Sequence, residues 1–426
     1  MSQGALPGFR DFYPSELAKR SYIFQGWRDV ARRYGFVEYD GPPLEPLDLY
    51  TKKSGAEIVE QLYNFEDKGG REVALRPEMT PTLARMVGAR ANALRKPVRW
   101  FSLPQLFRYE RQQRGRLREH FQLNMDIIGE ADVSADAELL AAAIDVMRVF
   151  GLTSDDVVAR VSDRRLLNAL LRGIGITEAQ LPAAYAALDK FDRDPRDVLQ
   201  KRLADAGLSA DTTAQLFELV GATADEAAFS RLVDAAGATA EWETLRTYLD
   251  HTESLGVRDW VRLDLSIVRG LAYYTGIVFE LFDAKGELRA ICGGGRYDTL
   301  LESLGGVSLP ALGFGMGDVV LGELLKERGK MPEAEPAVDV YVAYGDSGTV
   351  EDAMRAAAKI RASGKSVEYA LGNQKLARQL KAAYAAGANS TVVIATPELQ
   401  AGEAMVRHKN EKAELRVQLD EWIAAR

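Results

Sequence analysis

Arginine and other polar side chains concentrate between residues 100 and 130, where the chain reads WFSLPQLFRYERQQRGRLREHFQLNMDIIGE. Within this stretch five of eleven consecutive positions are arginine: Arg108, Arg111, Arg114, Arg116 and Arg118. A guanidinium keeps its charge and offers a planar fork of donors that matches phosphate and carboxylate. The stretch therefore predicts a site for a phosphorylated anion and a small polar ligand. The alternative is a solvated, arginine-rich hairpin tip.

Two strands are predicted to present these side chains. Apolar and polar residues alternate on both sides of the arginine-rich loop, with Phe107 and Tyr109 before it and residues 121–127 after it. A period of two gives each strand one apolar and one polar face. Gln122 and Asp126 then point the same way, about 13 Å apart at about 3.3 Å per residue. The pattern favours a hairpin whose polar face holds the binding groups.

A further candidate group lies upstream of this hairpin. Glu78 stands between two prolines in an irregular segment, directly behind a strand predicted at residues 72–75. Binding groups tend to be presented on such segments. Thr80, followed by Pro81, has the simpler interpretation of a helix N-cap. Another N-cap is predicted at Ser15, at the start of an N-terminal helix.

Two glycine-rich segments occur later in the chain. Three glycines at residues 293–295 let a backbone pass close to a bulky group. Gly313, Gly315 and Gly317 alternate along one face of a predicted strand that leads into a helix. No βαβ pattern surrounds them, which argues against a dinucleotide fingerprint.

Composition limits the classes of protein. The 426 residues suffice for two or three domains, and 47% are hydrophobic, which indicates a large core. One cysteine and three histidines argue against a zinc site built from those residues. We see no apolar run of about 18 residues and no secretory signal pattern, and therefore expect a cytoplasmic protein without a membrane span. The net charge of −8 argues against indiscriminate nucleic-acid binding, although a local basic surface could bind RNA.

Three regions are predicted. Residues 1–330 form the main domain, and within it residues from about 165 to 250 read as an inserted helical module. A proline-containing linker leads to residues 337–426, which alternate as β-α-β-α-β and predict a small α/β domain with a mostly parallel sheet. That last region has 12 Lys and Arg against 11 Asp and Glu, so it is close to neutral while the rest is acidic.

Taken together, these motifs resemble the histidyl-tRNA synthetases, a family of class II aminoacyl-tRNA synthetases. The resemblance rests on FRYERQQRGRLREHFQ, LRPEMT, IVRGLAYYTGIVFE and CGGGRYD, and on the linker and α/β tail. It implies an α+β fold, in which a catalytic domain built on an antiparallel sheet with helices has a helical insertion and is followed by an anticodon-binding domain. It also implies a homodimer that activates histidine with ATP and transfers the histidyl group to the 3′ end of tRNA(His).

The resemblance further implies a role for ten residues. Glu78, Thr80 and Gln122 would hold the histidine ammonium, Asp126 and Tyr274 the imidazole, and Tyr273 would line the pocket. Arg108 and Arg269 would grip the α-phosphate from opposite sides, next to the histidine carboxylate, so that Arg269 replaces a metal ion used by related enzymes. Glu110 would receive the adenine amino group, and Arg116 would reach the outer phosphates. Mg²⁺ is expected with ATP, without an assignable ligand set.

Elementary chemistry agrees with these roles. Attack of a carboxylate on a phosphate brings two anions together, so positioning and fixed positive charge must provide most of the catalysis. An imidazole needs an acceptor for its N–H and a partner for its other nitrogen, and a carboxylate with a phenol supplies both.

The chain departs from the family pattern at three places. After Gly317 it continues with Asp318, Val319 and Val320, so the arginine expected at position 320 is absent. Ala272 replaces a common aspartate, and His120-Phe121 inverts a usual Phe-His order. Two other functions compete with the synthetase. One is a catalytically inactive, synthetase-like regulatory subunit of the ATP phosphoribosyltransferase of histidine biosynthesis. The other is a plain RNA- or nucleotide-binding module.

Overall fold

The computed structural model describes residues 4–51, 61–109, 117–191, 193–223, 226–268, 274–333, 338–411 and 413–425. The chain forms two compact units, Met1–Pro332 and Glu333–Arg426. Among the described helices, none is long and apolar enough to cross a membrane.

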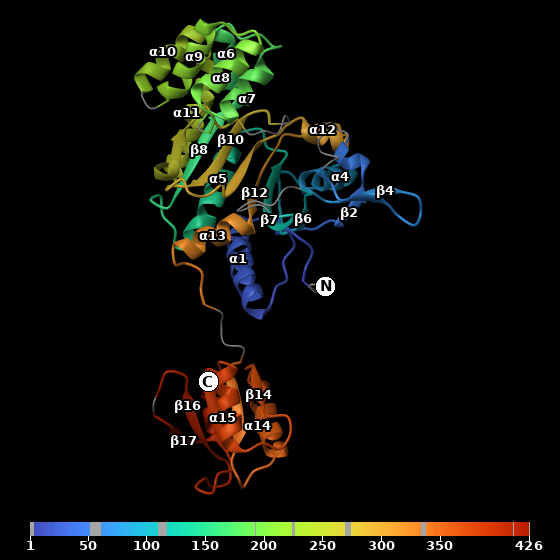
Figure 1. Ribbon diagram of the computed structural model, residues 1–426, viewed down its shortest axis with the longest axis vertical. Helices are drawn as coiled ribbons and strands as arrows, with labels where there is room; N and C mark the ends of the chain where they lie inside the picture. The colour runs from blue at the N-terminus through green and yellow to red at the C-terminus, as the bar shows by residue number, and fades with distance from the viewer. Residues whose placement is uncertain are drawn as a thin grey trace. The chain divides into compact units, whose positions relative to one another are not determined.

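A nine-stranded sheet forms the centre of the first unit (Figure 1). Its strands follow the order β1-β5-β7-β12-β11-β10-β8-β9, and β6 pairs with β7 beside this path. The central pairings are antiparallel, whereas β1 with β5 and β8 with β9 are parallel. The predicted antiparallel sheet is therefore confirmed. The strands span Val37–Glu38 (β1), Val98–Ser102 (β5), Gln105–Phe107 (β6), Glu119–Ile128 (β7), Val157–Asp163 (β8), Val261–Leu263 (β9), Ile277–Asp283 (β10), Cys292–Arg296 (β11) and Ala311–Gly317 (β12).

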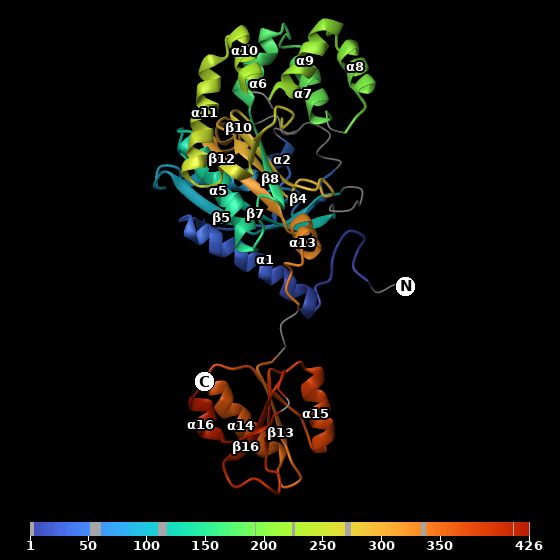
Figure 2. The ribbon, with the colours of Figure 1, turned by 90° about the vertical axis from the view of Figure 1, so that its left-hand side faces the viewer.

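Three helices cover one face of this sheet: α1 (Pro14–Arg33), α5 (Ser134–Val149) and α13 (Asp318–Glu327) (Figures 1 and 2). Leu123, Met125 and Ile127 of β7 point into the core beneath them and are fully buried. The residues between them face the other way, so the predicted period of two is confirmed. The apolar set fixes the register, because a slip of one residue would exchange the two faces.

A smaller sheet and the helices α2, α4 and α12 flank the opposite face. The order β2-β4-β3 joins Leu44–Pro46, Glu72–Leu75 and Asn64–Glu66. A turn joins β3 to β4, in which the Gly70 N–H donates to the Asp67 carbonyl at 2.9 Å. The short helix α2 spans Asp48–Thr51. Helices α4 (Thr80–Arg90) and α12 (Leu300–Gly305) meet so closely that a Cβ at Gly88 would lie 2.3 Å from the carbonyl oxygen of Gly305.

Six helices follow β8 and form a cluster at the end of the unit that carries β8 and β10 (Figures 1 and 2). Their apolar faces continue the main core through Leu170, Leu203 and Tyr248. A 3-10 turn, η1 (Arg258–Trp260), returns the chain to β9. The helices span Arg164–Gly173 (α6), Leu181–Asp189 (α7), Arg196–Asp205 (α8), Ala210–Ala222 (α9), Glu226–Ala236 (α10) and Thr239–Ser254 (α11).

The second unit has a five-stranded sheet in the order β14-β13-β15-β16-β17. Strands β13, β14 and β15 are parallel, as predicted, but an antiparallel pair, β16 and β17, extends the sheet beyond that prediction. Helices α14 and α16 pack on one face and α15 on the other. The elements span Val340–Tyr344 (β13), Val350–Ala362 (α14), Val367–Tyr369 (β14), Leu376–Ala385 (α15), Ser390–Ile394 (β15), Glu403–His408 (β16), Leu415–Gln418 (β17) and Leu419–Ala424 (α16).

Both predicted N-caps are wrong. Helix α1 begins at Pro14 with Tyr13 as its N-cap, and the Ser15 hydroxyl donates instead to the Glu16 carboxylate at 2.7 Å. Helix α4 includes Thr80 in its first turn and has Met79 at the N-cap position, without a side-chain cap. Each helix has a proline in its first two positions, Pro14 in α1 and Pro81 in α4, and neither N-cap residue makes a side-chain cap. The Thr80 hydroxyl is therefore not used as a cap.

Candidate active site

A cavity of about 250 Å³ lies on the face of the sheet that α1, α5 and α13 leave open. Glycines form its floor. Asn124 of β7 is in register with Gly315 of β12, which pairs in turn with Gly293 of β11. Two residues further along β7, Asp126 is paired in the same way with Gly313 of β12. The alternating glycines noted in the sequence thus create a trough between polar side chains.

Six of the ten site residues predicted from the sequence line this one cavity. They come from four separate segments: the turn before α4 with the first residue of that helix, the residue after β6, strand β7 and the segment before β10. The six are Glu78, Thr80, Arg108, Gln122, Asp126 and Tyr274. The other four, Glu110, Arg116, Arg269 and Tyr273, lie outside the described residues.

Asp126 is the most deeply buried acid of the cavity, with 4% of its surface exposed. Its carboxylate accepts a hydrogen bond from the Tyr297 hydroxyl. Burial raises the pKa of Asp126 to about 7, and the Tyr297 hydrogen bond opposes that rise only in part. A carboxyl group with this pKa can accept a hydrogen bond from a polar ring when it is ionised and can donate one when it is protonated.

Glu78 and Arg108 provide opposite charges at the cavity wall. Burial raises the pKa of Glu78, and the positive charge of Arg108 acts against that rise. The Arg108 Nε donates to the carbonyl of Pro77 at 3.0 Å, which ties the guanidinium to the segment that presents Glu78. The arrangement can hold a ligand that has both an ammonium and an anionic group.

Gln122 leans over β12 in the space that a glycine leaves free. A Cβ at Gly315 would come within 2.7 Å of Cδ and Nε2 of Gln122. At Gly295 a Cβ would lie 2.6 Å from the carbonyl oxygen of Ile277, 2.8 Å from Cγ1 of Val278 and 3.0 Å from Cδ1 of Tyr274, so both the strand pairing and the tyrosine ring exclude a side chain there. Gly315 is therefore required by a side chain of the cavity itself.

Among the polar and sulfur-containing residues that line the cavity, four were not predicted from the sequence: His120, Asn124, Cys292 and Tyr297. Two of them were within reach of the pattern. Asn124 lies midway between Gln122 and Asp126 and shares their face by the period of two. His120 shares it as well. Tyr297, by contrast, reaches Asp126 only because β11 and β12 bring it there, and no local pattern indicates that hydrogen bond.

The departures after Gly317 have different structural consequences. Asp318 is buried, where it receives the Arg10 Nη1 at 2.9 Å and the Phe121 N–H at 2.9 Å. Arg10 also binds Glu119 at 2.6 Å, so this cluster fastens the N-terminal segment to β7 and α13. Val320, in contrast, lines the cavity with an apolar side chain. The position at which the resemblance led us to expect an arginine carries no charge.

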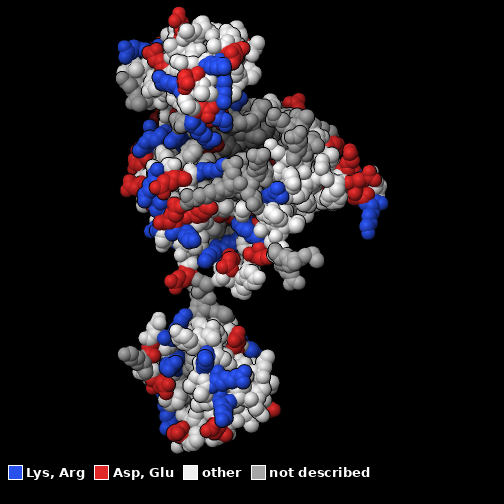
Figure 3. Space-filling view, in the orientation of Figure 1, with Lys and Arg blue, Asp and Glu red and all other residues white. Residues whose placement is uncertain are grey.

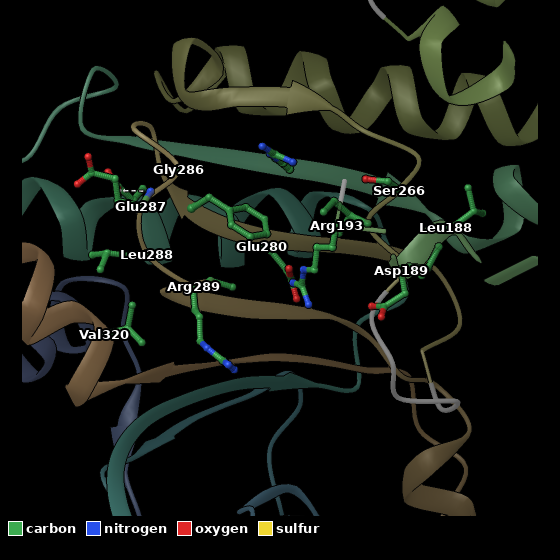
Figure 4. Close-up of a pocket in the computed structure, with 16 residues that line it drawn as sticks. Leu188, Asp189, Arg193, Ser266, Glu280, Gly286, Glu287, Leu288, Arg289 and Val320 are labelled. Atoms are coloured by element: carbon green, nitrogen blue, oxygen red, sulfur yellow. Dashed lines mark hydrogen bonds between the residues drawn. The ribbon is translucent and has the colours of Figure 1, made fainter. Parts of the chain in front are cut away.

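A second, larger cavity of about 680 Å³ adjoins the first, and Ala290 and Val320 line both. It lies between β10, the β10–β11 connection and the helical cluster (Figure 4). Three arginines line it, namely Arg160 of β8, Arg193 of the α7–α8 connection and Arg289 just before β11. In the part of the chain that the structure describes, no group of three or more His, Cys, Asp or Glu side chains could hold a metal ion.

The fold and this cavity define a class II aminoacyl-tRNA synthetase. The histidyl-tRNA synthetase family model matches residues 8–317, and an anticodon binding domain model matches residues 339–425. The chain therefore belongs to the histidyl-tRNA synthetase family. It is 44% identical to a histidine–tRNA ligase of Opitutus terrae, over 96% of this chain and 94% of that protein. It is 40% identical to the chloroplastic/mitochondrial histidine–tRNA ligase of Arabidopsis thaliana, over 97% and 85%.

Solved structures agree on the fold. A histidyl-tRNA synthetase from a Nostoc species superposes with a TM-score of 0.85 at 23% identity, covering 100% of this chain and 99% of that one. A Bacillus halodurans structure described as an ATP phosphoribosyltransferase regulatory subunit/histidyl-tRNA synthetase gives 0.75 at 22% identity, over 93% and 99%. At these identities the likeness concerns the fold alone. The choice between synthetase and regulator rests on the more similar relatives, which favour the synthetase.

Proposed function

We propose that this chain activates L-histidine with ATP in the glycine-floored cavity and then transfers the histidyl group to tRNA(His). The observation that supports this most is the convergence of Glu78, Arg108 and Asp126 on one cavity of amino-acid size. These groups match the ammonium, carboxylate and imidazole of histidine respectively. We propose cytoplasmic activity as a homodimer, and Mg²⁺ enters as the counter-ion of ATP.

Histidine binds with its imidazole at Asp126 and Tyr274 and its ammonium at Glu78, Thr80 and Gln122. The Tyr297 hydroxyl holds the Asp126 carboxylate in place, so the imidazole meets a fixed partner. A buried polar site of this kind rejects ligands that leave its groups unpaired, by roughly 10⁴–10⁵ where a hydrogen bond to the ligand is lost. Tyr273 lines the same pocket by resemblance.

Adenylate formation needs positive charge at the α-phosphate. A histidine carboxylate oxygen attacks the α-phosphorus, the bond to the bridging oxygen breaks, and pyrophosphate leaves with the electron pair. Arg108 and Arg269 grip the α-phosphate during this exchange, Glu110 receives the adenine amino group, and Arg116 reaches the outer phosphates. Guanidinium groups that are already in position need not reorganise as negative charge moves to the pyrophosphate. We expect this electrostatic stabilisation to be the main source of catalysis.

The second unit is proposed to read the anticodon of the tRNA. Its match to an anticodon binding domain supports this assignment. Lys and Arg gather over α15 on the face of this unit seen in Figure 3. A basic helix face is suited to the phosphate backbone of RNA.

Histidine-dependent exchange of labelled pyrophosphate into ATP tests the first step directly. We expect exchange that needs histidine and ATP but no tRNA, and charging of tRNA(His) in the presence of all three. A chain that binds histidine without any exchange would instead be the regulatory subunit. A chain that binds RNA or nucleotide but not histidine would be a binding module.

A further inference from the structure

Arg289 stands where the two cavities meet. It precedes Ala290, which lines both, and it faces the larger cavity together with Val320 at the start of α13. Figure 4 shows Leu288, Arg289 and Val320 on the same side of that cavity. In the register of β11 with β12, Cys292 pairs with Met316; Arg289 lies three residues before Cys292, and Val320 lies four residues after Met316.

The charges of the larger cavity are mixed. Asp283 is held by an ion pair with Arg328 and by the Lys285 and Glu287 N–H groups. Asp189 binds Lys190 at 2.6 Å. Arg160 binds Asp264 at 3.4 Å and stands opposite Glu280 in the β8–β10 register. Acidic and basic side chains are thus interspersed over most of the cavity wall, so the cavity as a whole is not suited to binding an anion.

The arginines also differ in direction. In Figure 4, Arg193 and Glu280 point toward one another from opposite sides of the cavity, whereas Arg289 points away from both. The residues that line both cavities, Ala290 and Val320, are uncharged. Arg289 lines the larger cavity and immediately precedes Ala290, one of the two residues that line both cavities.

The proposed reaction requires positive charge where the two cavities meet. A cavity of about 250 Å³ that holds histidine and the α-phosphate leaves the rest of ATP to extend into adjoining space. The pyrophosphate leaving group carries the largest negative charge of the reaction, and it must be stabilised by fixed donors as the bond breaks. An arginine suits this purpose because its planar fork donates two hydrogen bonds to one phosphate.

We propose that Arg289 binds the outer phosphates of ATP and stabilises the pyrophosphate as it leaves. This inference rests on the proposed adenylation function and adds a residue to it. Arg289 supplies a guanidinium on the side of the larger cavity where Val320 stands, the position at which the resemblance led us to expect an arginine. Histidine and the adenosine moiety are bound by other groups, so Arg289 distinguishes ATP from AMP rather than one amino acid from another.

The test compares ligands with and without outer phosphates. Binding of ATP, pyrophosphate, AMP and a sulfamoyl analogue of histidyl-adenylate is measured by calorimetry for the wild type and for Arg289→Gln. We expect ATP and pyrophosphate to bind about 10- to 100-fold more weakly to the variant, as for the loss of a hydrogen bond to a charged group. AMP and the analogue should bind as to the wild type. Arg289→Lys, which keeps the charge without the fork, should lie between.

Lys285→Gln is the matched control, because it removes a positive charge from the same β10–β11 connection without lining either cavity. Its ATP binding should be unchanged. Equal ATP affinity in wild type and Arg289→Gln would overturn the inference, as would equal weakening of ATP and the adenylate analogue. Pyrophosphate exchange is measured in parallel. Absence of exchange in the wild type would reject the proposed function, whereas a selective loss of ATP over AMP binding in Arg289→Gln would still support the phosphate contact.

Discussion

The carboxylate of Asp126 lies directly over Gly313, so close that a Cβ at position 313 would come within 1.9 Å of its Oδ1. The two residues face each other across β7 and β12. The pairing of β7 with β12 therefore fixes both the Asp126 side chain and the glycine beneath it. Any side chain at position 313 would displace the Asp126 carboxylate.

Replacing Gly313 by alanine should displace Asp126 and weaken histidine binding. We expect the KM for histidine in pyrophosphate exchange to rise at least about 10-fold, because a methyl group would occupy the place of the carboxylate oxygen. Gly322→Ala is the control. There the added Cβ would meet only Cδ1 of Ile23 at 3.6 Å, an ordinary contact, and a helical alanine is favoured over glycine. If both variants show normal histidine dependence, the position of Asp126 does not govern binding.

Tyr297 should prove to be a positioning residue. Tyr297→Phe removes the hydroxyl that donates to Asp126 and leaves the ring in place. Loss of a hydrogen bond to a charged group costs about 1.5–3 kcal/mol, so the KM for histidine should rise about 10- to 100-fold. The KM for ATP should be unchanged, which separates this effect from general unfolding. A parallel rise of both KM values would contradict the assignment.

The pKa of Asp126 predicts a pH dependence of stability. The carboxyl titrates at about 7 in the folded chain and at about 3.9 when unfolded, so the native state binds this proton more tightly. The proton bound to Asp126 makes its full contribution to the free energy of unfolding below about pH 4, and this contribution is lost as the pH rises to about 7. The loss is at most about 4 kcal/mol for a shift of this size. Asp126→Asn cannot titrate but keeps an oxygen for Tyr297.

Urea unfolding of the ligand-free protein at about pH 5 and about pH 8, on either side of the folded-state pKa, measures this effect. The asparagine variant should gain stability relative to the wild type as the pH is raised. All other titrating groups are common to both proteins and cancel in the comparison. If the free energies of unfolding of the wild type and of Asp126→Asn change in parallel between these pH values, Asp126 does not titrate with a raised pKa.

Part of this site could be predicted from local sequence, whereas the roles of Thr80, Arg108 and Tyr274 came from the resemblance to the family. The period of two in residues 121–127 assigns Gln122 and Asp126 to one face, and six predicted residues do share one cavity. What local patterns could not supply are hydrogen bonds made across strands, such as Tyr297 to Asp126 or Arg10 to Asp318. Cap assignments failed for a different reason, since α1 and α4 each have a proline in their first two positions and no side-chain cap. The antiparallel β16–β17 pair was missed because short strands after a parallel unit give only a weak signal.

Arg108 and Arg269 should act together on the α-phosphate. Either Arg108→Gln or Arg269→Ala should lower the rate of pyrophosphate exchange by at least about 10²–10³, by comparison with the loss of one oxyanion donor. The free energies should not add in the double variant, because both groups act on one transition state. Near-normal exchange in Arg269→Ala, with the fold intact by circular dichroism, would refute its role.

The exposed face of α15 should bind RNA. The inner side of this helix is held on β13 by Gln379. Its side-chain oxygen accepts from the Tyr344 N–H at 3.1 Å, and its side-chain nitrogen donates to the Tyr344 carbonyl at 3.1 Å. On the outer side Tyr384 is 86% exposed, and Lys381, three residues before it, and Arg378 are exposed as well. An aromatic ring among cations is suited to stacking on an unpaired base while the charges meet phosphates.

Replacing Arg378 and Lys381 by glutamine and Tyr384 by alanine should raise the KM for tRNA(His) in charging about 10- to 100-fold, at about 1–3 kcal/mol for the stacked base. Pyrophosphate exchange should be unchanged, because adenylate formation needs no tRNA. The salt dependence of tRNA binding should also become shallower, by about one unit in slope for each phosphate that the variant no longer binds. Arg355→Gln is the control, because this arginine lies on α14, on the opposite face of the same sheet, and pairs with Asp352. If the control weakens charging as much as the α15 variant, RNA binds through the α14 face instead.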